Sequence, residues 1–338
     1  MKEADLYEVT DQTKHLVQCH LCNHHCLIKD GSRGRCLVRE NQGGKLLSLV
    51  YGRLISENVD PIEKKPIFHL KPGSLSYSIA TVGCNFKCLH CQNYEISQYP
   101  RIHSGKIPGA IRSPESVVTA AAQQNCQSIS YTYVEPTIFF EFAYETSQLA
   151  NAAGIKNVFV SNGYTSPEAT KKIAPYLDAN NIDLKAFSEK FYHDVCGAKL
   201  APVLKTINLM KELGVWVEVT TLIIPGWNDS DKELKSIADF IMGIDSSIPW
   251  HVTRYYPTYK MTDHPPTSVD HLLRAREIGL DAGLKYVYAG NIPGQGGENT
   301  YCPSCKKIVI QRTGYRIHAV NLDNGACSSC GEIIAGIF

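Results

Sequence analysis

The chain has 338 residues, 43% of them hydrophobic and 20% charged, which is enough for one large α/β domain with small appendages. Its formal net charge of +1 argues against a dominant role in binding nucleic acid or an anionic membrane. The first residues are too polar and acidic for a secretory signal, and no apolar run approaches the roughly 20 residues of a membrane helix, so we expect a cytoplasmic protein.

The first 70 residues show little repeating pattern but hold a C-x2-C-x3-C-x9-C set of cysteines: Cys19, Cys22, Cys26 and Cys36. A cytoplasmic compartment keeps thiols reduced, so such a set indicates a metal site more than a disulfide framework. Zinc and a second iron–sulfur cluster would both satisfy four thiolates, and the sequence does not decide between them. We expect residues 1–70 to form an N-terminal cysteine-rich module with its histidines at the surface.

Strand-like and helix-like segments alternate from about residue 75 onward. Runs rich in β-branched and aromatic residues predict strands at 75–82, 128–134, 157–163, 181–187, 216–224, 250–257 and 286–290. Helices between them carry start signals at Ser113 and Ser166 and stop signals at Gly154 and Gly214. Repeated strand–helix units imply a parallel sheet, and polar residues cluster near the strand ends. We therefore favour a full or partial (β/α) barrel over residues 71–294 rather than an open doubly wound sheet.

A C-x3-C-x2-C triplet, Cys84, Cys88 and Cys91, directly follows the first predicted strand. Three thiolates at this spacing fit on one loop and can ligate three irons of a [4Fe-4S] cube. The fourth iron is then open to bind a substrate as well as to pass an electron, which predicts a reaction centre. Zinc or an ordinary electron-transfer cluster are the alternatives. The lone cysteines, Cys126 and Cys196, are expected to be ordinary, partly buried residues.

The end of the chain carries a second kind of cysteine pattern. A glycine-rich linker is predicted at 292–299, and residues 295–338 are expected to form a C-terminal zinc-ribbon-like module. Two C-x2-C knuckles joined by a predicted hairpin supply four thiolates: Cys302, Cys305, Cys327 and Cys330. We favour structural zinc over iron here, because zinc–thiolate binding alone can fold a small segment.

The triplet and its place after a first strand resemble the signature of the radical S-adenosylmethionine (SAM) superfamily. The resemblance implies that the fourth iron of a [4Fe-4S] cluster binds SAM. An electron from the cluster then cleaves SAM to methionine and a 5′-deoxyadenosyl radical, which abstracts a hydrogen atom from a substrate.

The same resemblance implies which residues lie next to SAM. In TYVEPT, Glu135 matches the acid of the family's glycine–glycine–glutamate motif, with Tyr133 and Val134 in place of the glycines; an acid there also suits the start of the next helix. Further candidates are Ser161 and Asn162 in VSNGY, Asp183 and Lys185 in NIDLKAF, and Arg254 with Tyr255 and Tyr256, the last three from position alone. Asp183 and Lys185 are two apart on a predicted strand, so they face the same side and predict a polar pair in the barrel mouth.

Two narrower resemblances bear on the reaction. NIDLKAF and TLIIPGWNDS resemble the glycyl-radical (pyruvate formate-lyase) activating enzymes, although no matching histidine follows the sixth strand, and His90 stands where the family usually has an aromatic residue. The whole chain resembles the radical SAM component of the AmmeMemoRadiSam system, most visibly in CHLCNHHCLIKDGSRGRCLVREN, GCNFKCLHCQNYEISQ and HVTRYYPTYKMTDHPPT.

These resemblances imply a Memo-like and a second partner protein, an electron donor, and a substrate that they do not identify. The leading hypothesis is hydrogen abstraction by a radical SAM enzyme. The alternatives are a glycyl-radical activase acting on a partner protein, and a non-catalytic zinc-binding adaptor.

Overall fold

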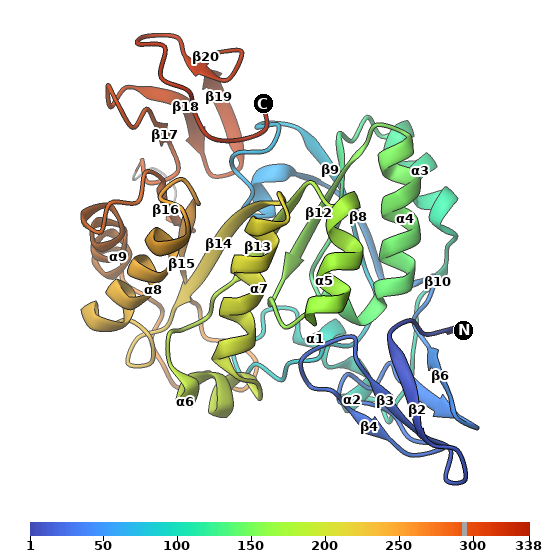
Figure 1. Ribbon diagram of the computed structural model, residues 1–338. Coiled ribbons are helices and arrows are strands. Elements are labelled where there is room, and N and C mark those ends of the chain that lie inside the picture. The colour runs from blue at the N-terminus through green and yellow to red at the C-terminus, as the bar shows by residue number, and fades with distance from the viewer. Residues whose placement is uncertain (293–295) are drawn as a thin grey trace.

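The computed structural model describes residues 1–292 and 296–338, and its centre is an eight-stranded sheet (Figure 1). From edge to edge the order is β16-β15-β14-β13-β12-β11-β9-β8, and every neighbouring pair is parallel except β8 with β9. The strands are β8 (Ser56–Pro61), β9 (Leu75–Ala80), β11 (Ser128–Tyr131), β12 (Lys156–Ser161), β13 (Ala179–Asp183), β14 (Trp216–Ile223), β15 (Trp250–Arg254) and β16 (Val287–Gly290).

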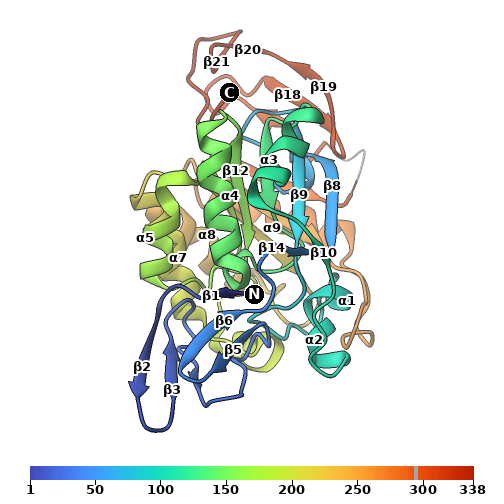
Figure 2. The ribbon, with the colours of Figure 1, turned by 90° about the vertical axis from the view of Figure 1, so that its right-hand side faces the viewer.

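Helices connect the parallel strands and cover the outside of the curved sheet (Figures 1 and 2). They are α3 (Pro114–Gln123), α4 (Phe140–Ala152), α5 (Pro167–Ile173), α7 (Leu200–Glu212), α8 (Asp231–Ile244) and α9 (Val269–Asp281). Since β8 and β16 are the two ends of the strand order, the sheet is a partial (β/α) barrel over the described residues. This confirms the predicted fold class.

Local signals explain most of these boundaries. Ser113 and Ser166 cap α3 and α5, each accepting a hydrogen bond from a backbone N–H of the first turn at 3.2 Å. Gly154 and Gly214 follow α4 and α7 with φ of +74° and +81°, as predicted. One strand differs from its predicted range of 181–187: β13 ends at Asp183, because the chain turns tightly there and the next N–H bonds back to Ile182.

The N-terminal region adds short strands at the carboxyl end of the barrel strands, at the bottom of Figure 2. They are β1 (Lys2–Glu3), β2 (Tyr7–Asp11), β3 (Leu16–Cys19), β4 (Leu27–Ile28), β5 (Arg39–Gln42), β6 (Lys45–Ser48) and β7 (Arg53–Leu54), with β10 (Ala110–Ile111) pairing with β7. Nearby lie α1 (Tyr94–Ser97) and α2 (Tyr99–Ile102), which follow the cysteine triplet. β8 falls within residues 1–70 and yet pairs with β9 in the central sheet. Ile62, Ile67 and Leu70, from the same stretch, pack in one hydrophobic core with residues of β12 and β13.

The C-terminal region covers the opposite end of the barrel, at the top of Figure 2. Its strands are β17 (Thr300–Tyr301), β18 (Ile308–Thr313), β19 (Arg316–Val320), β20 (Leu322–Asp323) and β21 (Ala326–Cys327). Phe68, Tyr286 and Tyr288 share one hydrophobic core with it.

Only part of the predicted linker at 292–299 can be assessed. Pro293, Gly294 and Gln295, and with them the predicted boundary at 294, lie outside the described residues. The described part of this segment packs on the barrel. The backbone N–H of Ala289, on β16, donates to the Gly297 carbonyl, and Glu298 is buried.

Among the described residues there is no helix whose length and hydropathy would let it span a bilayer.

Candidate active site and metal centres

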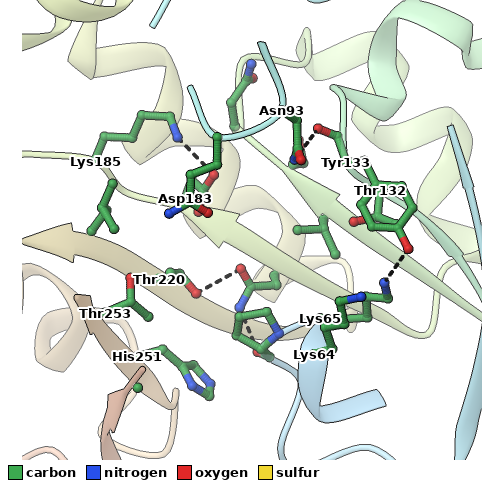
Figure 3. Close-up of a pocket in the computed structure, with 18 of the residues that line it drawn as sticks. Lys64, Lys65, Asn93, Thr132, Tyr133, Asp183, Lys185, Thr220, His251 and Thr253 are labelled. Carbon is green, nitrogen blue, oxygen red and sulfur yellow. Dashed lines mark hydrogen bonds and ion pairs between the residues drawn. The ribbon is translucent and has the colours of Figure 1, made fainter. Parts of the chain in front are cut away.

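The carboxyl ends of the parallel strands surround a cavity of about 520 Å³ (Figure 3). Most of the residues predicted to lie at the site line it: Cys84, Cys88, Cys91, Glu135, Ser161, Asn162, Asp183 and Lys185. The structure therefore brings together, from four separate segments, side chains that the sequence could only place near strand ends.

The triplet loop follows β9 and is held from two sides. The backbone N–H groups of Lys87 and Leu89 donate to carbonyls of the short helical turn Tyr192–Cys196 at 2.9 and 3.0 Å. Ser97, at the end of α1, hydrogen-bonds the Cys91 thiol at 3.2 Å. These contacts fix the loop so that all three thiols reach the cavity.

The donor set around the cavity fits a cluster with three protein ligands. Cys196 lies next to Cys88, and their hydrogen bond, followed by burial, raises the pKa of the Cys88 thiol. Cys196 is fully buried, however, and is not among the residues that line the described cavity. Burial is the main cause of the raised pKa of the Cys84 and Cys91 thiols, which means that metal binding must displace protons from the triplet.

Glu135 ties the ends of β11 and β12 together. Its carboxylate accepts bonds from the Thr137 hydroxyl (2.6 Å), the Ser161 hydroxyl (2.9 Å) and the Asn162 backbone N–H (2.7 Å). It also caps the short turn Pro136–Phe139, which is the structural role that the sequence allowed for an acid here. Burial raises the pKa of Glu135 even though these donors oppose the shift. Its predicted contact with SAM stays a prediction.

Tyr133 adopts the backbone conformation that a glycine would adopt at no cost. Its φ is +64°, and the Val134 N–H donates to the Thr132 carbonyl across it, closing a tight turn. The Tyr133 carbonyl accepts a bond from Asn93 at 2.9 Å (Figure 3). A non-glycine residue with positive φ is strained, and its presence at the cavity wall is typical of a functional site.

Asp183 and Lys185 form the polar pair that their spacing predicts (Figure 3). The ammonium lies 2.9 Å from the carboxylate, and both line the cavity. Burial opposes the charge of Lys185, but Asp183 and the thiols of Cys88 and Cys196 outweigh it and raise the pKa of Lys185 well above its usual value. The site thus keeps a positive charge beside the triplet.

Two buried polar groups of the cavity were missed from the sequence. Lys65 lies 2.6 Å from Asp60 and also contacts Tyr133, and burial lowers its pKa to about 8. His251, on β15, lies 2.6 Å from Glu218 with both side chains buried. The period of two along β15 could have identified His251, since it places residue 251 on the same face as Thr253.

Arg254 is not part of this constellation. Its Nε donates to the Thr267 carbonyl at 2.7 Å, its guanidinium stacks on Tyr256, and it does not line the described cavity. Tyr255 is fully buried, and its hydroxyl donates a hydrogen bond to the Met261 carbonyl. Arg254 and Tyr255 therefore both lie outside the described cavity.

The two flanking cysteine sets differ in their geometry. Cys19, Cys22, Cys26 and Cys36 line one small cavity in the N-terminal region. In the C-terminal region the thiols of Cys302, Cys305, Cys327 and Cys330 all lie within 4.8 Å of one another and could hold a metal ion. All 13 cysteines of the chain are free, so the structure contains no disulfide framework in the part that it describes.

Comparisons with known proteins identify the family of the chain. The family model of the radical SAM superfamily matches residues 78–241. The chain is 47% identical to the uncharacterized protein MJ0808 of Methanocaldococcus jannaschii over 99% of both chains. It is 25% identical to the putative glycyl-radical enzyme activating enzyme MJ1632 of that organism, over 60% of this chain and 76% of the relative.

A solved structure shows the same fold. Streptococcus suis SuiB bound to the precursor peptide SuiA superposes with a TM-score of 0.51 at 16% identity, over 68% of this chain and 51% of SuiB. Together with the triplet at the mouth of a partial barrel, these similarities show that the chain belongs to the radical SAM superfamily of enzymes.

Proposed function

We propose that this enzyme reductively cleaves SAM to generate a 5′-deoxyadenosyl radical, which abstracts hydrogen from a substrate bound in the same cavity. The observation that carries the proposal is that three thiols, Cys84, Cys88 and Cys91, line a cavity of about 520 Å³, with no fourth cysteine among the described residues that line it. Superfamily membership implies a [4Fe-4S] cluster, which would supply one electron and an open iron for SAM.

The side chains around the triplet would orient SAM. Glu135 is fixed by its donors and suits the SAM amino group, while Ser161 and Asn162 supply polar atoms from the end of β12. Asp183 can accept a hydrogen bond from a hydroxyl or ammonium group. Lys185 neutralises charge near Cys88. Each of these side chains is held by a partner within the protein, so little reorganisation is required when the ligand binds.

The rest of the cavity suits a polar substrate. Lys65, His251 and Thr253 also line it, and the β18–β19 hairpin contributes Gly314 and Tyr315. A lysine with a pKa of about 8 can exchange protons near neutral pH, and His251 adds a second nitrogen-bearing side chain to the cavity wall. The substrate is therefore expected to carry hydrogen-bonding groups.

The proposal is tested by anaerobic reconstitution followed by incubation with SAM and dithionite. Wild-type protein should yield methionine and 5′-deoxyadenosine, measured by mass spectrometry. Cys88→Ala should reduce product at least a hundredfold, because the cluster loses one of its three ligands. Cys126→Ala, at a buried cysteine outside the described cavity, is the matched control. Normal turnover by Cys88→Ala would refute the assignment.

Cys196→Ala decides whether Cys196 is a ligand. It should retain the iron content of the wild type, because its thiol does not line the cavity. Loss of about a quarter or more of the iron would identify Cys196 as a ligand and contradict the open coordination site.

The similarity to MJ1632 favours a second candidate, an activase that places a glycyl radical on a partner protein. A persistent organic radical on the partner, seen by electron paramagnetic resonance after incubation, would support it. The AmmeMemoRadiSam resemblance supports a Memo-like protein and a second protein of that system as partners, with an external electron donor. Adding each purified partner to the SAM assay tests this, with new products or radical signals as the readout.

We also propose that the C-terminal thiols hold structural zinc. Four thiolates around a single zinc ion at 2.3 Å lie about 3.8 Å apart. Cys302 and Cys330 are separated by 3.6 Å, and Cys305 and Cys327 by 3.8 Å. We propose a reducing compartment such as the cytoplasm, because metal-binding thiolates persist where thiols are kept reduced.

A further inference from the structure

We propose that Cys19, Cys22, Cys26 and Cys36 hold a second [4Fe-4S] cluster, and that this cluster exchanges electrons with the one at the triplet. The assignment of the metal rests on the residues of the N-terminal region alone. The electron-transfer role rests in addition on the proposed function.

The spacing of the thiols separates a cluster from a single ion. The C-terminal cysteines are the one group of possible ligands, three or more in number, that comes within 4.8 Å in the ranges 1–292 and 296–338. The N-terminal thiols instead line a cavity, as the thiols of the triplet do. A cubane places four irons and four sulfides between its thiolates and therefore needs such a space, whereas a single zinc ion holds its thiolates close together. In this respect the N-terminal set resembles the triplet and not the C-terminal site.

A buried guanidinium, paired with Glu141, lines the N-terminal cavity. Arg39 is 2% exposed and lines the cavity, and its charge lies close to the thiols of Cys19 and Cys36. Its other nitrogens bond Glu141 and the Asp5 carbonyl, but its Nε has no partner among the described residues. A hydrogen bond from this Nε–H to a cluster sulfur would satisfy the orphaned donor.

The two cysteine sites share one wall of backbone. Gly83, before Cys84, packs so closely on the N-terminal region that a Cβ there would lie 3.2 Å from the Cys36 carbonyl oxygen. Asn85, after Cys84, lines the N-terminal cavity, and its carbonyl bonds the His24 ring at 2.8 Å. Both neighbours of a triplet ligand thus touch the second site.

This adjacency suits one-electron transfer. A low-potential donor protein would reduce the N-terminal cluster by one electron. Passing that electron to the triplet cluster would return the first cluster to its oxidised state. No bond forms or breaks in this exchange, and no proton moves.

Metal analysis tests the assignment without any mutation. Anaerobically reconstituted wild-type protein should contain about eight irons with equal sulfide, and one zinc, per chain. About four irons with two zinc ions would overturn the proposal. A triple variant, Cys84→Ser with Cys88→Ser and Cys91→Ser, should keep about four irons and a reduced-cluster resonance signal that SAM does not perturb. Eight irons without 5′-deoxyadenosine in the wild type would refute the proposed function and leave the second cluster standing.

A double variant tests the electron-transfer role. Cys22→Ser with Cys36→Ser should lose about four irons, keep its zinc and far-ultraviolet circular dichroism, and retain the triplet cluster. Reduction of the triplet cluster by reduced plant-type ferredoxin, a donor too large to enter the cavity, should slow at least tenfold relative to Cys126→Ser. Dithionite is small enough to enter the cavity, so the rate at which it reduces the triplet cluster should fall by a smaller factor. An unchanged rate with ferredoxin would overturn the electron-transfer role.

Discussion

At the scale of single residues, the cavity keeps a positive charge beside a set of thiols. Lys185 is held by Asp183 at 2.9 Å and lies close enough to Cys88 for the two charges to interact. A cation near an iron–sulfur cluster stabilises its reduced, more negative form and therefore raises its reduction potential.

Lys185→Met removes this charge while keeping a side chain of similar length. The midpoint potential of the triplet cluster should fall on the order of tens of millivolts, measured by a redox titration followed by electron paramagnetic resonance. Lys205→Met, at an exposed lysine of α7, should leave the potential unchanged. A potential equal to that of the wild type would show that Asp183 already neutralises Lys185 completely.

Which site residues could be predicted depended on how each one reaches the cavity. Asp183 and Lys185 share a strand face, so the period of two was sufficient to pair them. Lys65 reaches the same cavity from the segment before β9, where no local pattern marks it, and only the tertiary fold brings it to Tyr133. Arg254 lies at the end of β15, but its guanidinium donates a hydrogen bond to the Thr267 carbonyl and not to a group in the cavity.

At the scale of elements, Gly83 joins β9 to the triplet loop under severe constraint. Its φ is +99°, and an added Cβ would lie 2.6 Å from a Val38 methyl group and 3.2 Å from the Cys36 carbonyl. Gly83 therefore adopts a backbone conformation that would strain any other residue, and it lies between the two cysteine sites.

Gly83→Ala should destabilise the protein by about 2–4 kcal/mol, combining the left-handed backbone penalty with overpacking. It should also lower iron content, because the triplet loop must shift. Gly214→Ala is the matched control, since Gly214 has a φ of +81° and open space around it, so only the backbone penalty of about 1–2 kcal/mol applies. Urea denaturation and iron analysis measure both variants. Equal losses in the two would show that the contact with Val38 and Cys36 is not needed.

The strands that could be predicted from the sequence are those rich in β-branched and aromatic side chains. The parallel strands are rich in buried β-branched and aromatic residues, so their positions followed from composition. β8, Ser56–Pro61, is polar and has only one buried residue, Asp60, and its place in the sheet comes from backbone pairing with β9. Nothing in its side chains marks it as a strand of the barrel.

At the scale of the whole molecule, the two cysteine-rich regions cover opposite ends of the barrel (Figure 2). The C-terminal end of the chain is tied down by His69, whose Nδ1 bonds the Ala335 carbonyl and whose Nε2 accepts a bond from Tyr288, both at 2.6 Å. Nδ1–H donates to the Ala335 carbonyl, so in a neutral imidazole Nε2 is left to accept from the Tyr288 hydroxyl.

Burial lowers the pKa of His69 to about 4, from 6.5 in a free histidine; Glu218 opposes the shift, while Arg312 and His251 add to it. Between these pH values the unfolded chain binds a proton that the folded protein does not. The stability that neutral His69 supports is therefore present above pH 6.5 and is lost as the pH falls toward 4, by about 3 kcal/mol.

His69→Asn keeps a donor for Ala335 and cannot be protonated. At pH 7.5 it should be less stable than the wild type by about 1–3 kcal/mol, because the Tyr288 hydroxyl loses its acceptor. As the pH falls from 6.5 to 4 the difference should shrink and then vanish, since only the wild type pays for protonating the ring. Urea denaturation of both proteins at matched pH and metal content measures this difference, and the comparison cancels the acid sensitivity of the metal sites. Parallel stability curves across this range would show that His69 does not control how the C-terminal region docks on the barrel.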